Sequence, residues 1–150
     1  MNDAKFVYVI YIAAKPEKVF EALIDGEMTR QYWFHDNVSD WKPGSRWEHR
    51  RLDGEKQARV VGKVLECTPP KRLVLSWASP ENEADRSKYS RVTLEVEPVA
   101  DMVRLTVTHE ELEPGSDMLR GISGGWPRVL SSLKSFLETG KPLDIMASKK

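Results

Sequence analysis

The side chains best suited to proton transfer or to directional hydrogen bonds near neutral pH are His35, His49 and His109. His109 continues the alternation of Leu105 and Val107, so its ring is predicted to face the covered side of a sheet. There it would be a hydrogen-bonded wall residue or, alternatively, the general base of a reaction. Because the three histidines lie on different expected elements without Cys or carboxylate partners at ligand spacing, no metal site is predicted.

A second group of side chains that could bind a ligand or take part in chemistry lies on the strand that follows Gly44. Trp47, His49 and Arg51 share one face of it, since they are two residues apart. If that face points inward, Trp47 and His49 line a pocket, and Arg51 at its mouth would meet an anionic head group. The alternation alone does not decide which face is inside, so both orientations stay open.

Other catalytic chemistries are weakly supported. Cys67 falls near a strand end before two prolines and is interpreted as a buried, inert thiol. The sequence contains no glycine-rich phosphate loop, nucleophile elbow or dinucleotide fingerprint. We therefore predict no cofactor and assign no catalytic residue. A single cysteine also excludes an internal disulfide, which favours a cytoplasmic location.

Length and charge narrow the class of protein further. A chain of 150 residues has the size of a single domain, here residues 1–150. Lys+Arg and Asp+Glu both number 23, so the basic excess typical of nucleic-acid binders is missing and no nucleic-acid partner is predicted. The longest apolar run, residues 6–14, is too short to cross a bilayer, and the polar residues before it lead us to expect no secretory signal. No membrane insertion is predicted.

The expected elements begin with a strand over residues 5–14, whose apolar residues favour a position deep in a sheet covered on both faces. A helix over residues 15–25 follows, with Gly26 ending it in a left-handed conformation, and then a short helix over residues 27–34. Successive strands without intervening helices indicate an antiparallel sheet and an α+β fold. These strands are predicted over residues 45–52, 57–68, 72–79, 89–99 and 102–112.

The last expected element is a long amphipathic helix that covers the apolar face of the sheet. Gly124, Gly125 and Pro127 interrupt it, and a proline in this position bends or breaks a helix at a cost of about 3 kcal/mol. Either the helix bends to follow a curved sheet, or the interruption leaves space beneath Trp126. The apolar stripe runs through Met118 or Leu119, Ile122, Trp126, Val129 or Leu130, Leu133, and Phe136 or Leu137.

Aromatic residues are predicted to converge beneath this helix. Trp33, with its neighbours Tyr32 and Phe34, caps one end, and Trp77 faces the same space. Aromatic walls with a few polar groups are typical of a pocket that binds a flat or hydrophobic ligand. The alternative is a well-filled aromatic core.

Three stretches resemble a known family: YIAAKPEKVFEALID near the start, VVGKVLECTPPKRLVLSW in the middle, and LTVTHEEL with GWPRVLSSLKSFLE near the end. From Phe6 to about Pro142 the chain is similar to bacterial single-domain members of the activator of heat-shock protein 90 ATPase homologue family. That family belongs to the START-like superfamily, also called the polyketide cyclase and lipid-transport or SRPBCC superfamily.

The resemblance implies a helix-grip fold, in which a curved antiparallel sheet wraps around the C-terminal helix with an apolar pocket between them. It also implies that members mostly bind hydrophobic small molecules, while a minority catalyse reactions in the pocket. We combine these expectations with the residue patterns into one set of pocket-lining residues. The set is Trp33, Trp47, His49, Arg51, Trp77, Leu94, Leu105, Val107, His109, Ile122, Trp126 and Leu130.

Three hypotheses for the function follow. The first is a monomer or homodimer that binds a hydrophobic or aromatic small molecule in this pocket. The second is an enzyme of cyclase or hydratase type in the same pocket, with His109 as general base. The third is a chaperone-associated interaction module, by analogy with the co-chaperone that names the family.

Overall fold

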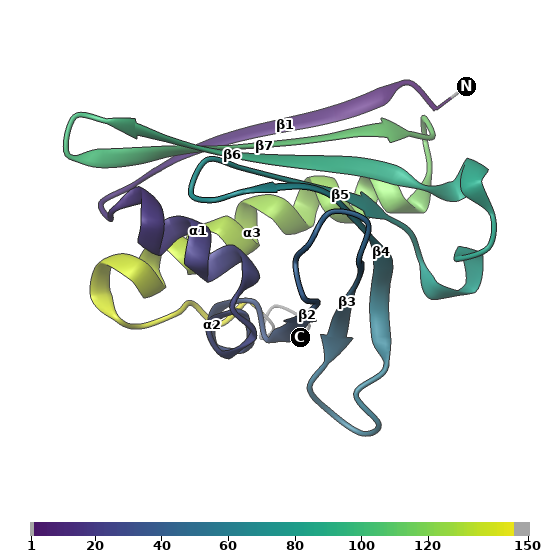
Figure 1. Cartoon of the computed structure of the whole chain (residues 1–150), viewed down its shortest axis with the longest axis horizontal. Helices are drawn as coiled ribbons and strands as arrows, with labels where there is room; N and C mark the ends of the chain where they lie inside the picture. The colour runs from purple at the N-terminus through teal and green to yellow at the C-terminus, as the bar shows by residue number, and fades with distance from the viewer. Residues whose placement is uncertain (1, 146–150) are drawn as a thin grey trace.

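The computed structural model describes residues 2–145, and within them seven strands form one antiparallel sheet in the order β1-β7-β6-β5-β4-β3-β2 (Figure 1). The strands are β1 (Ala4–Ile12), β2 (His35–Val38), β3 (Arg46–Arg51), β4 (Ala58–Thr68), β5 (Arg72–Trp77), β6 (Ser90–Val99) and β7 (Met102–Leu112). The helices are α1 (Pro16–Ile24), α2 (Gly26–Tyr32) and α3 (Asp117–Thr139). Two short 3-10 helices, η1 (Pro80–Asn82) and η2 (Arg86–Lys88), lie between β5 and β6.

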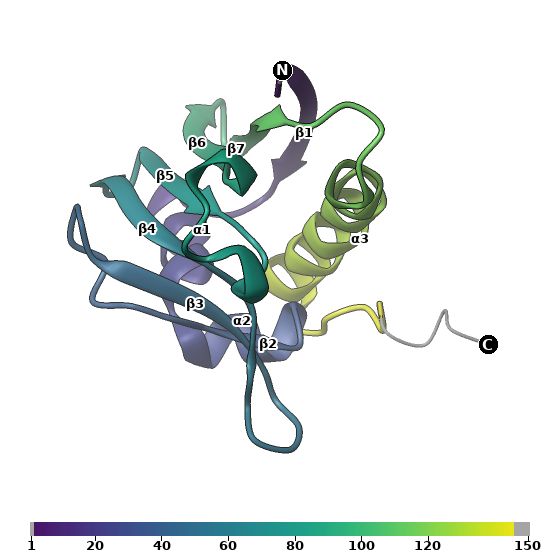
Figure 2. The same cartoon turned by 90° about the vertical axis from the view of Figure 1, so that its right-hand side faces the viewer.

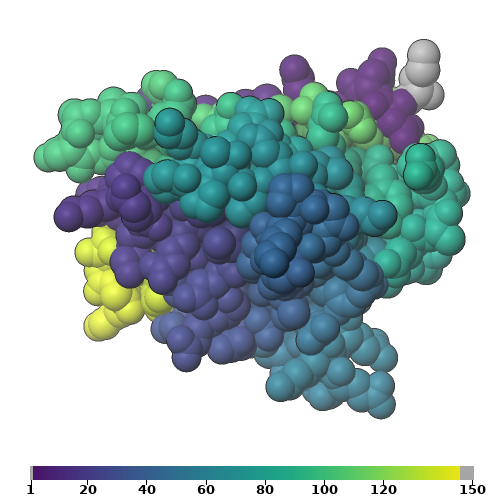
Figure 3. All heavy atoms as spheres, in the orientation of Figure 1, coloured from purple at the N-terminus to yellow at the C-terminus, as the bar shows by residue number. Residues whose placement is uncertain are grey.

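The sheet is curved, and α3 runs along its concave side (Figure 2). Helices α1 and α2 lie between β1 and β2 in the chain and close one end of this concave side. The loop between β3 and β4 projects away from the rest of the molecule (Figure 3). The arrangement confirms the predicted α+β helix-grip architecture.

The β6–β7 hairpin is where the alternation in the sequence is best preserved. Val92 pairs with His109, and Leu94 pairs with Val107. All four side chains are buried, because their face of the hairpin looks toward the helices. β7 has the predicted bounds, residues 102–112. This hairpin therefore places His109 on the inner face of the sheet, as predicted.

The prediction that the first strand lies deep in the sheet is wrong. β1 is an edge strand that pairs with β7 alone. Its outward side chains Val7, Val9 and Tyr11 are 51%, 45% and 43% exposed, whereas Ile12 is fully buried. An apolar residue on each face therefore does not require a cover on each face, because folded proteins expose much apolar surface.

Two local features between α1 and β3 differ from the predictions. β2 is an additional strand, and its polar sequence HDNV gave no alternation by which to find it. Gly26 does not end α1 in a left-handed conformation; it is the first residue of α2, and the carboxylate of Asp25 caps that helix by accepting from the Glu27 amide at 2.9 Å. A Cβ on Gly26 would collide with the Asp36 side chain, so this glycine permits the close approach of β2.

Helix α3 is not broken at Pro127. It is one α-helix of 23 residues, capped by the Ser116 hydroxyl, which accepts from the Leu119 amide at 3.1 Å. Gly140 follows its last turn with a φ of +83°. The predicted apolar stripe is confirmed, and its buried packing on both sides of the proline offsets the loss of one backbone hydrogen bond. The buried residues of α3 are Ile122, Trp126, Val129, Leu130, Ser132 and Leu133.

Candidate functional site

A cavity of about 310 Å³ lies between α3 and the part of the sheet formed by β2, β3, β4 and β5. Helix α3 packs against β1, α1 and α2, so the cavity forms on the side where α3 stands away from the other strands. The lining residues are Trp33, His35, His49, Arg59, Val60, Trp77, Gly121, Ile122, Gly125, Trp126, Arg128, Val129 and Ile145.

Two glycines of α3 leave room for this cavity. Gly121 and Gly125 are four residues apart and both line it. A Cβ built on either of them would meet no atom within 4 Å. Since glycine inside a helix costs roughly 1 kcal/mol relative to alanine, neither is explained by close packing. Their effect is to keep one face of α3 free of side chains where it borders the cavity.

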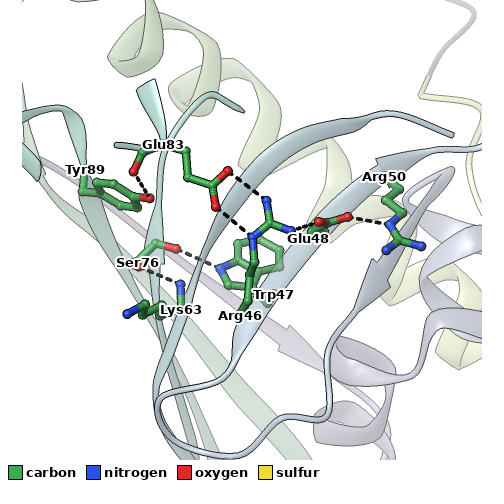
Figure 4. Close-up of polar contacts among 8 residues, drawn as sticks. All are labelled: Arg46, Trp47, Glu48, Arg50, Lys63, Ser76, Glu83 and Tyr89. Carbon is green, nitrogen blue, oxygen red and sulfur yellow. Dashed lines mark hydrogen bonds and ion pairs between the residues drawn. The ribbon is translucent and has the colours of Figure 1, made fainter. Parts of the chain in front are cut away.

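Strand β3 turns its odd-numbered residues Trp47 and His49 inward, which settles the orientation that the alternation left open. These two residues are 1% and 5% exposed. On the outer face, Arg46 forms an ion pair with Glu83 at 2.8 Å, and Glu48 accepts from Arg50 at 2.6 Å (Figure 4). This row of charges holds the polar face of β3 toward solvent.

Trp47 is anchored beneath the cavity rather than in its wall. Its indole Nε1 donates to the Ser76 carbonyl at 2.8 Å, across the strand β4 that separates them (Figure 4). Gly62 lies directly opposite Trp47 in the β3–β4 pairing, and a Cβ there would collide with the Ser76 carbonyl and crowd the indole nitrogen. The missing side chain at Gly62 is therefore what allows this hydrogen bond.

The wall of the cavity is an aromatic cluster. The ring centroids of Trp33 and Trp126 are 5.4 Å apart, and those of Trp77 and Trp126 are 5.6 Å apart. The ring of His49 lies 4.6 Å from that of Trp33. These distances are typical of aromatic side chains in direct contact. The predicted convergence of tryptophans is present, and it borders an open space rather than filling it.

His49 presents a hydrogen-bond acceptor to the cavity. Its Nδ1 lies 2.6 Å from Asn37 Oδ1, and the Asn37 amide nitrogen donates to the Leu23 carbonyl at 3.4 Å. Because the amide oxygen must accept, Nδ1 carries the proton, and Nε2 keeps its lone pair. No group among residues 2–145 forms a hydrogen bond with Nε2. Burial is the main cause that lowers the pKa of His49 well below its ordinary value, and electrostatic interactions with His35 and Arg59 act in the same direction, so the ring is neutral.

His35 stacks on His49, with ring centroids 4.3 Å apart and an interplanar angle of 13°. Its Nδ1 donates to the Trp33 carbonyl at 3.0 Å. Burial is the main cause that lowers the pKa of His35, and the positive charge of Arg59 acts in the same direction. The result is a pair of stacked, neutral imidazoles at one side of the cavity.

His109, by contrast, has no nitrogen left for a ligand. Trp126 Nε1 donates to His109 Nδ1 at 3.1 Å, so His109 Nε2 carries the proton and donates to the Ser90 hydroxyl at 2.8 Å. The hydroxyl in turn donates to the Trp77 carbonyl at 3.2 Å. His109 is fully buried, and burial lowers its pKa to about 3. This geometry is that of a buried, hydrogen-bonded structural residue beneath the cavity wall and not of a general base.

The two arginines at this end of the sheet occupy different environments. Arg51 lies outside the cavity, where its guanidinium makes two hydrogen bonds to the Asp53 carboxylate at 2.8 and 2.9 Å. Arg59 lies on the neighbouring strand β4 and lines the cavity. No acidic side chain within residues 2–145 forms an ion pair with Arg59. The positively charged side chain at the cavity is therefore that of Arg59 and not that of Arg51, which was predicted to lie at the mouth of the pocket.

The structure divides the predicted pocket residues into three groups. Those that line the cavity are Trp33, His49, Trp77, Ile122 and Trp126. Those that belong to the buried interior beneath it are Trp47, Leu94, Leu105, Val107, His109 and Leu130. Arg51 lies outside, because it ends β3 and pairs with Asp53 in the following loop.

Eight of the residues that line the cavity were not in the predicted set, and two of them, His35 and Arg59, carry polar groups from neighbouring strands. They reach the cavity because β2 and β4 flank β3, a neighbourhood that depends on strand pairing. The polar sequence of β2 carries no alternation, and Arg59 directly precedes the segment Val60, Val61 and Gly62 without any pattern that marks a cavity residue. No local signal in the sequence could therefore have found either of them.

The described part of the chain offers neither a metal site nor a membrane-spanning helix, and its one cysteine is not activated. Within residues 2–145, no three His, Cys, Asp or Glu side chains lie close enough together to hold a metal ion. None of the helices in the same range is long and apolar enough to span a membrane. Cys67 is half-buried, and burial raises the pKa of its thiol, which disfavours the nucleophilic thiolate.

Comparisons with known proteins agree with the fold. The family model described as Activator of Hsp90 ATPase homolog 1-like protein matches residues 13–138. A search among curated proteins returned no match. The structure of the Aha1 dimer from Colwellia psychrerythraea is similar with a TM-score of 0.77 and 23% identity, over 92% of this chain and 98% of that chain.

Two further solved structures share the architecture. PFC0360w, an HSP90 activator from Plasmodium falciparum, has a TM-score of 0.73 and 24% identity, over 89% of this chain and 95% of that chain. CalU16 from Micromonospora echinospora has a TM-score of 0.71 and 23% identity, over 91% of this chain and 77% of that chain. At these identities the likeness is one of fold.

Proposed function

Because this chain belongs to the Activator of Hsp90 ATPase homolog 1-like family, we propose that it uses the helix-grip fold to bind a hydrophobic or aromatic small molecule. The observation that carries the proposal is the cavity of about 310 Å³ between α3 and the sheet, with Trp33, Trp77 and Trp126 in its wall. Ligand sites of small-molecule binders are typically concave, mostly apolar and of roughly 300–1,000 Å³.

The cavity also offers a small number of polar groups to orient a ligand. His49 Nε2 is an acceptor, and Arg59 is a donor with a fixed positive charge. An apolar wall with few directed polar groups selects a ligand by shape first and by hydrogen bonding second. This combination supports a binding module over a filled aromatic core.

Native mass spectrometry of the protein purified from its own organism tests the proposal. We expect a species heavier than the polypeptide, which loses a small apolar molecule on denaturation. The released mass identifies the chemical class of the ligand. A protein that is free of small molecules, and that also takes up none of a panel of apolar compounds, contradicts the proposal.

A second candidate is catalysis of proton transfer in the same cavity. One observation favours it: His49 has a neutral ring with Nε2 unoccupied at the cavity wall, held in one tautomer by Asn37. His109, the base suggested by the sequence pattern, has both nitrogens engaged. A general base in this site is therefore His49 or its stacked neighbour His35, whose Nδ1 donates to the Trp33 carbonyl and leaves Nε2 with a lone pair.

A chaperone-associated role is a third candidate, favoured by the family description and by the HSP90 activator from Plasmodium falciparum among the similar structures. Its test is the ATPase rate of the Hsp90 of the same organism, measured with and without this protein. An unchanged rate at saturating protein contradicts the role. Similarity of fold alone is a weak basis for it.

The remaining parts of the proposal concern assembly and location. We propose a single domain over residues 1–150 that works in the cytoplasm as a monomer or a homodimer. The lone Cys67 supports a reducing compartment, and one similar structure is that of a dimer. Light scattering across a concentration series distinguishes the two states of assembly.

A further inference from the structure

Arg59 differs from the arginines on the outer surface of the same sheet. Arg46 is paired with Glu83, and Arg51 is paired with Asp53. Arg59 lines the cavity, and no acidic side chain among residues 2–145 neutralises it. The Arg59 side chain is exposed, so it borders the cavity where solvent and an incoming ligand can reach it.

The charged groups of the described lining have one sign. They are Arg59 from β4 and Arg128 from α3, and the lining residues given above include neither aspartate nor glutamate. Arg128 already has an interaction partner, so the positive charge assigned to a ligand is that of Arg59. The two histidines of the lining, His35 and His49, are neutral, and the positive charge of Arg59 is one cause of their lowered pKa values. An incoming anion therefore meets positive charge without a competing carboxylate from those lining residues.

The guanidinium group is also suited to the geometry of an anion. It presents parallel N–H donors that match a carboxylate or a sulfonate, which gives two charge-assisted hydrogen bonds at once. The tryptophans of the wall come from the end of α2, from β5 and from α3, and they offer an apolar surface to the body of a ligand. One ligand can satisfy both features only if it is apolar over most of its surface and anionic at one end.

We propose that the ligand of this cavity carries one anionic group, a carboxylate or a group of the same geometry, which Arg59 binds while the apolar body lies against Trp33, Trp77 and Trp126. The inference deepens the function proposed above and rests on it, because it requires that the cavity binds a small molecule. It assigns the anion-binding role to Arg59 and not to Arg51.

Two fluorescent probes with the same ring system test the inference. Anilinonaphthalene sulfonate carries one anionic group, and phenylnaphthylamine is its neutral counterpart. Both are titrated into the wild-type protein, Arg59→Gln and Arg51→Gln, the last being a matched control on the adjacent strand and outside the cavity. Near-ultraviolet circular dichroism verifies that each variant keeps its tertiary structure.

We expect both probes to bind the wild-type protein in a saturable manner. Arg59→Gln weakens the sulfonate probe by about tenfold, the effect of losing one charge-assisted contact, and leaves the neutral probe unchanged. Arg51→Gln changes neither affinity. Added salt weakens the binding of the sulfonate probe more in the wild-type protein than in Arg59→Gln.

The possible failures are distinguishable. If neither probe binds the folded wild-type protein, the proposed small-molecule site itself is contradicted, and this inference with it. If both probes bind but Arg59→Gln leaves the sulfonate affinity unchanged, or lowers both affinities equally, the role of Arg59 is contradicted while the proposed function stands. An equal loss in Arg51→Gln also contradicts it, because that result indicates a general surface charge effect.

Discussion

Trp126 and His109 are joined by a hydrogen bond of 3.1 Å, in which the indole Nε1 of α3 donates to the imidazole Nδ1 of β7. The chain of hydrogen bonds continues from His109 to the Ser90 hydroxyl and from there to the Trp77 carbonyl. It links the helix to three neighbouring strands of the sheet. Because Trp126 also lines the cavity, the same bond fixes the position of the cavity wall.

The substitution Trp126→Phe tests this link. It removes the indole donor and leaves His109 Nδ1 buried without a partner, so we expect the free energy of unfolding to fall by about 1–3 kcal/mol beyond the loss of buried area. Urea denaturation measures the change. Trp33→Phe is the matched control, since the indole nitrogen of Trp33 makes no hydrogen bond within residues 2–145. Equal losses in the two variants contradict the role of the hydrogen bond.

The buried histidines predict a dependence of stability on pH. Burial lowers the pKa of His109 to about 3 and that of His49 well below its ordinary value, so both stay neutral in the folded protein while the unfolded chain takes up protons near pH 6.5. The folded state is therefore fully stabilised above about pH 6.5 and loses stability as the pH falls below it. Each histidine contributes a slope of up to about 1.4 kcal/mol per pH unit.

Urea denaturation between about pH 7 and pH 5 measures this slope. We expect His109→Gln to be less stable at neutral pH but to show a flatter dependence, because one of the titrating groups is gone. His49→Gln provides an independent check if His109→Gln does not fold. A wild-type midpoint that is constant over this range contradicts the assignment of neutral, buried rings.

The inner faces of β6 and β7 were predictable because strict alternation is enforced when only one face of a strand is covered. The position of His109 on the inner face, and the continuous stripe that includes Ile122 and Trp126, followed from the same kind of periodicity. These features depend on residues near one another in the chain, where sequence patterns are informative.

The features that were not predicted depend on which strands become neighbours. β1 has apolar residues on both faces, but its outer face is uncovered, so Val7 and Val9 are exposed. No local pattern distinguishes such an edge strand from a central one. His35 and Arg59 reach the cavity because β2 and β4 lie on either side of β3. The polar strand β2 carries no alternation at all, so periodicity could not predict the strand or the position of His35.

The close approach of β4 and β5 at Gly62 is a further point to test. A methyl group in Gly62→Ala would collide with the Ser76 carbonyl, and it would crowd the Trp47 indole that donates to that carbonyl. We expect a loss of about 3 kcal/mol or more, or failure to fold, measured by thermal denaturation. Gly124→Ala is the control, where open space and a helical backbone predict a gain of roughly 1 kcal/mol. A tolerated Gly62→Ala contradicts the packing described for these strands.

The candidate role of His49 as a base is testable without knowledge of a natural substrate. Nitrobenzisoxazole is a flat aromatic compound whose ring opens when a base removes the proton on carbon: the proton passes to His49 Nε2, the N–O bond breaks, and a phenolate with a nitrile is formed. We expect a rate above that of the reaction in buffer without protein, lost in His49→Gln, because proton transfer by a positioned side chain typically contributes about 100-fold or more. A rate that His49→Gln does not change contradicts the role of His49 as the base, and the same measurement on His35→Gln then tests its stacked neighbour.

The central claim is that a small molecule binds between α3 and the sheet, and the measurement that tests it most directly compares two neighbouring glycines of α3. Gly125 lines the cavity, whereas Gly124 is exposed and lies outside it. Leucine at either position improves helix propensity by a similar amount, so the two variants differ mainly in where the side chain lies. The affinity of neutral phenylnaphthylamine is measured for both. We predict a loss of about tenfold or more in Gly125→Leu and wild-type affinity in Gly124→Leu; equal affinities in the two variants would contradict the claim.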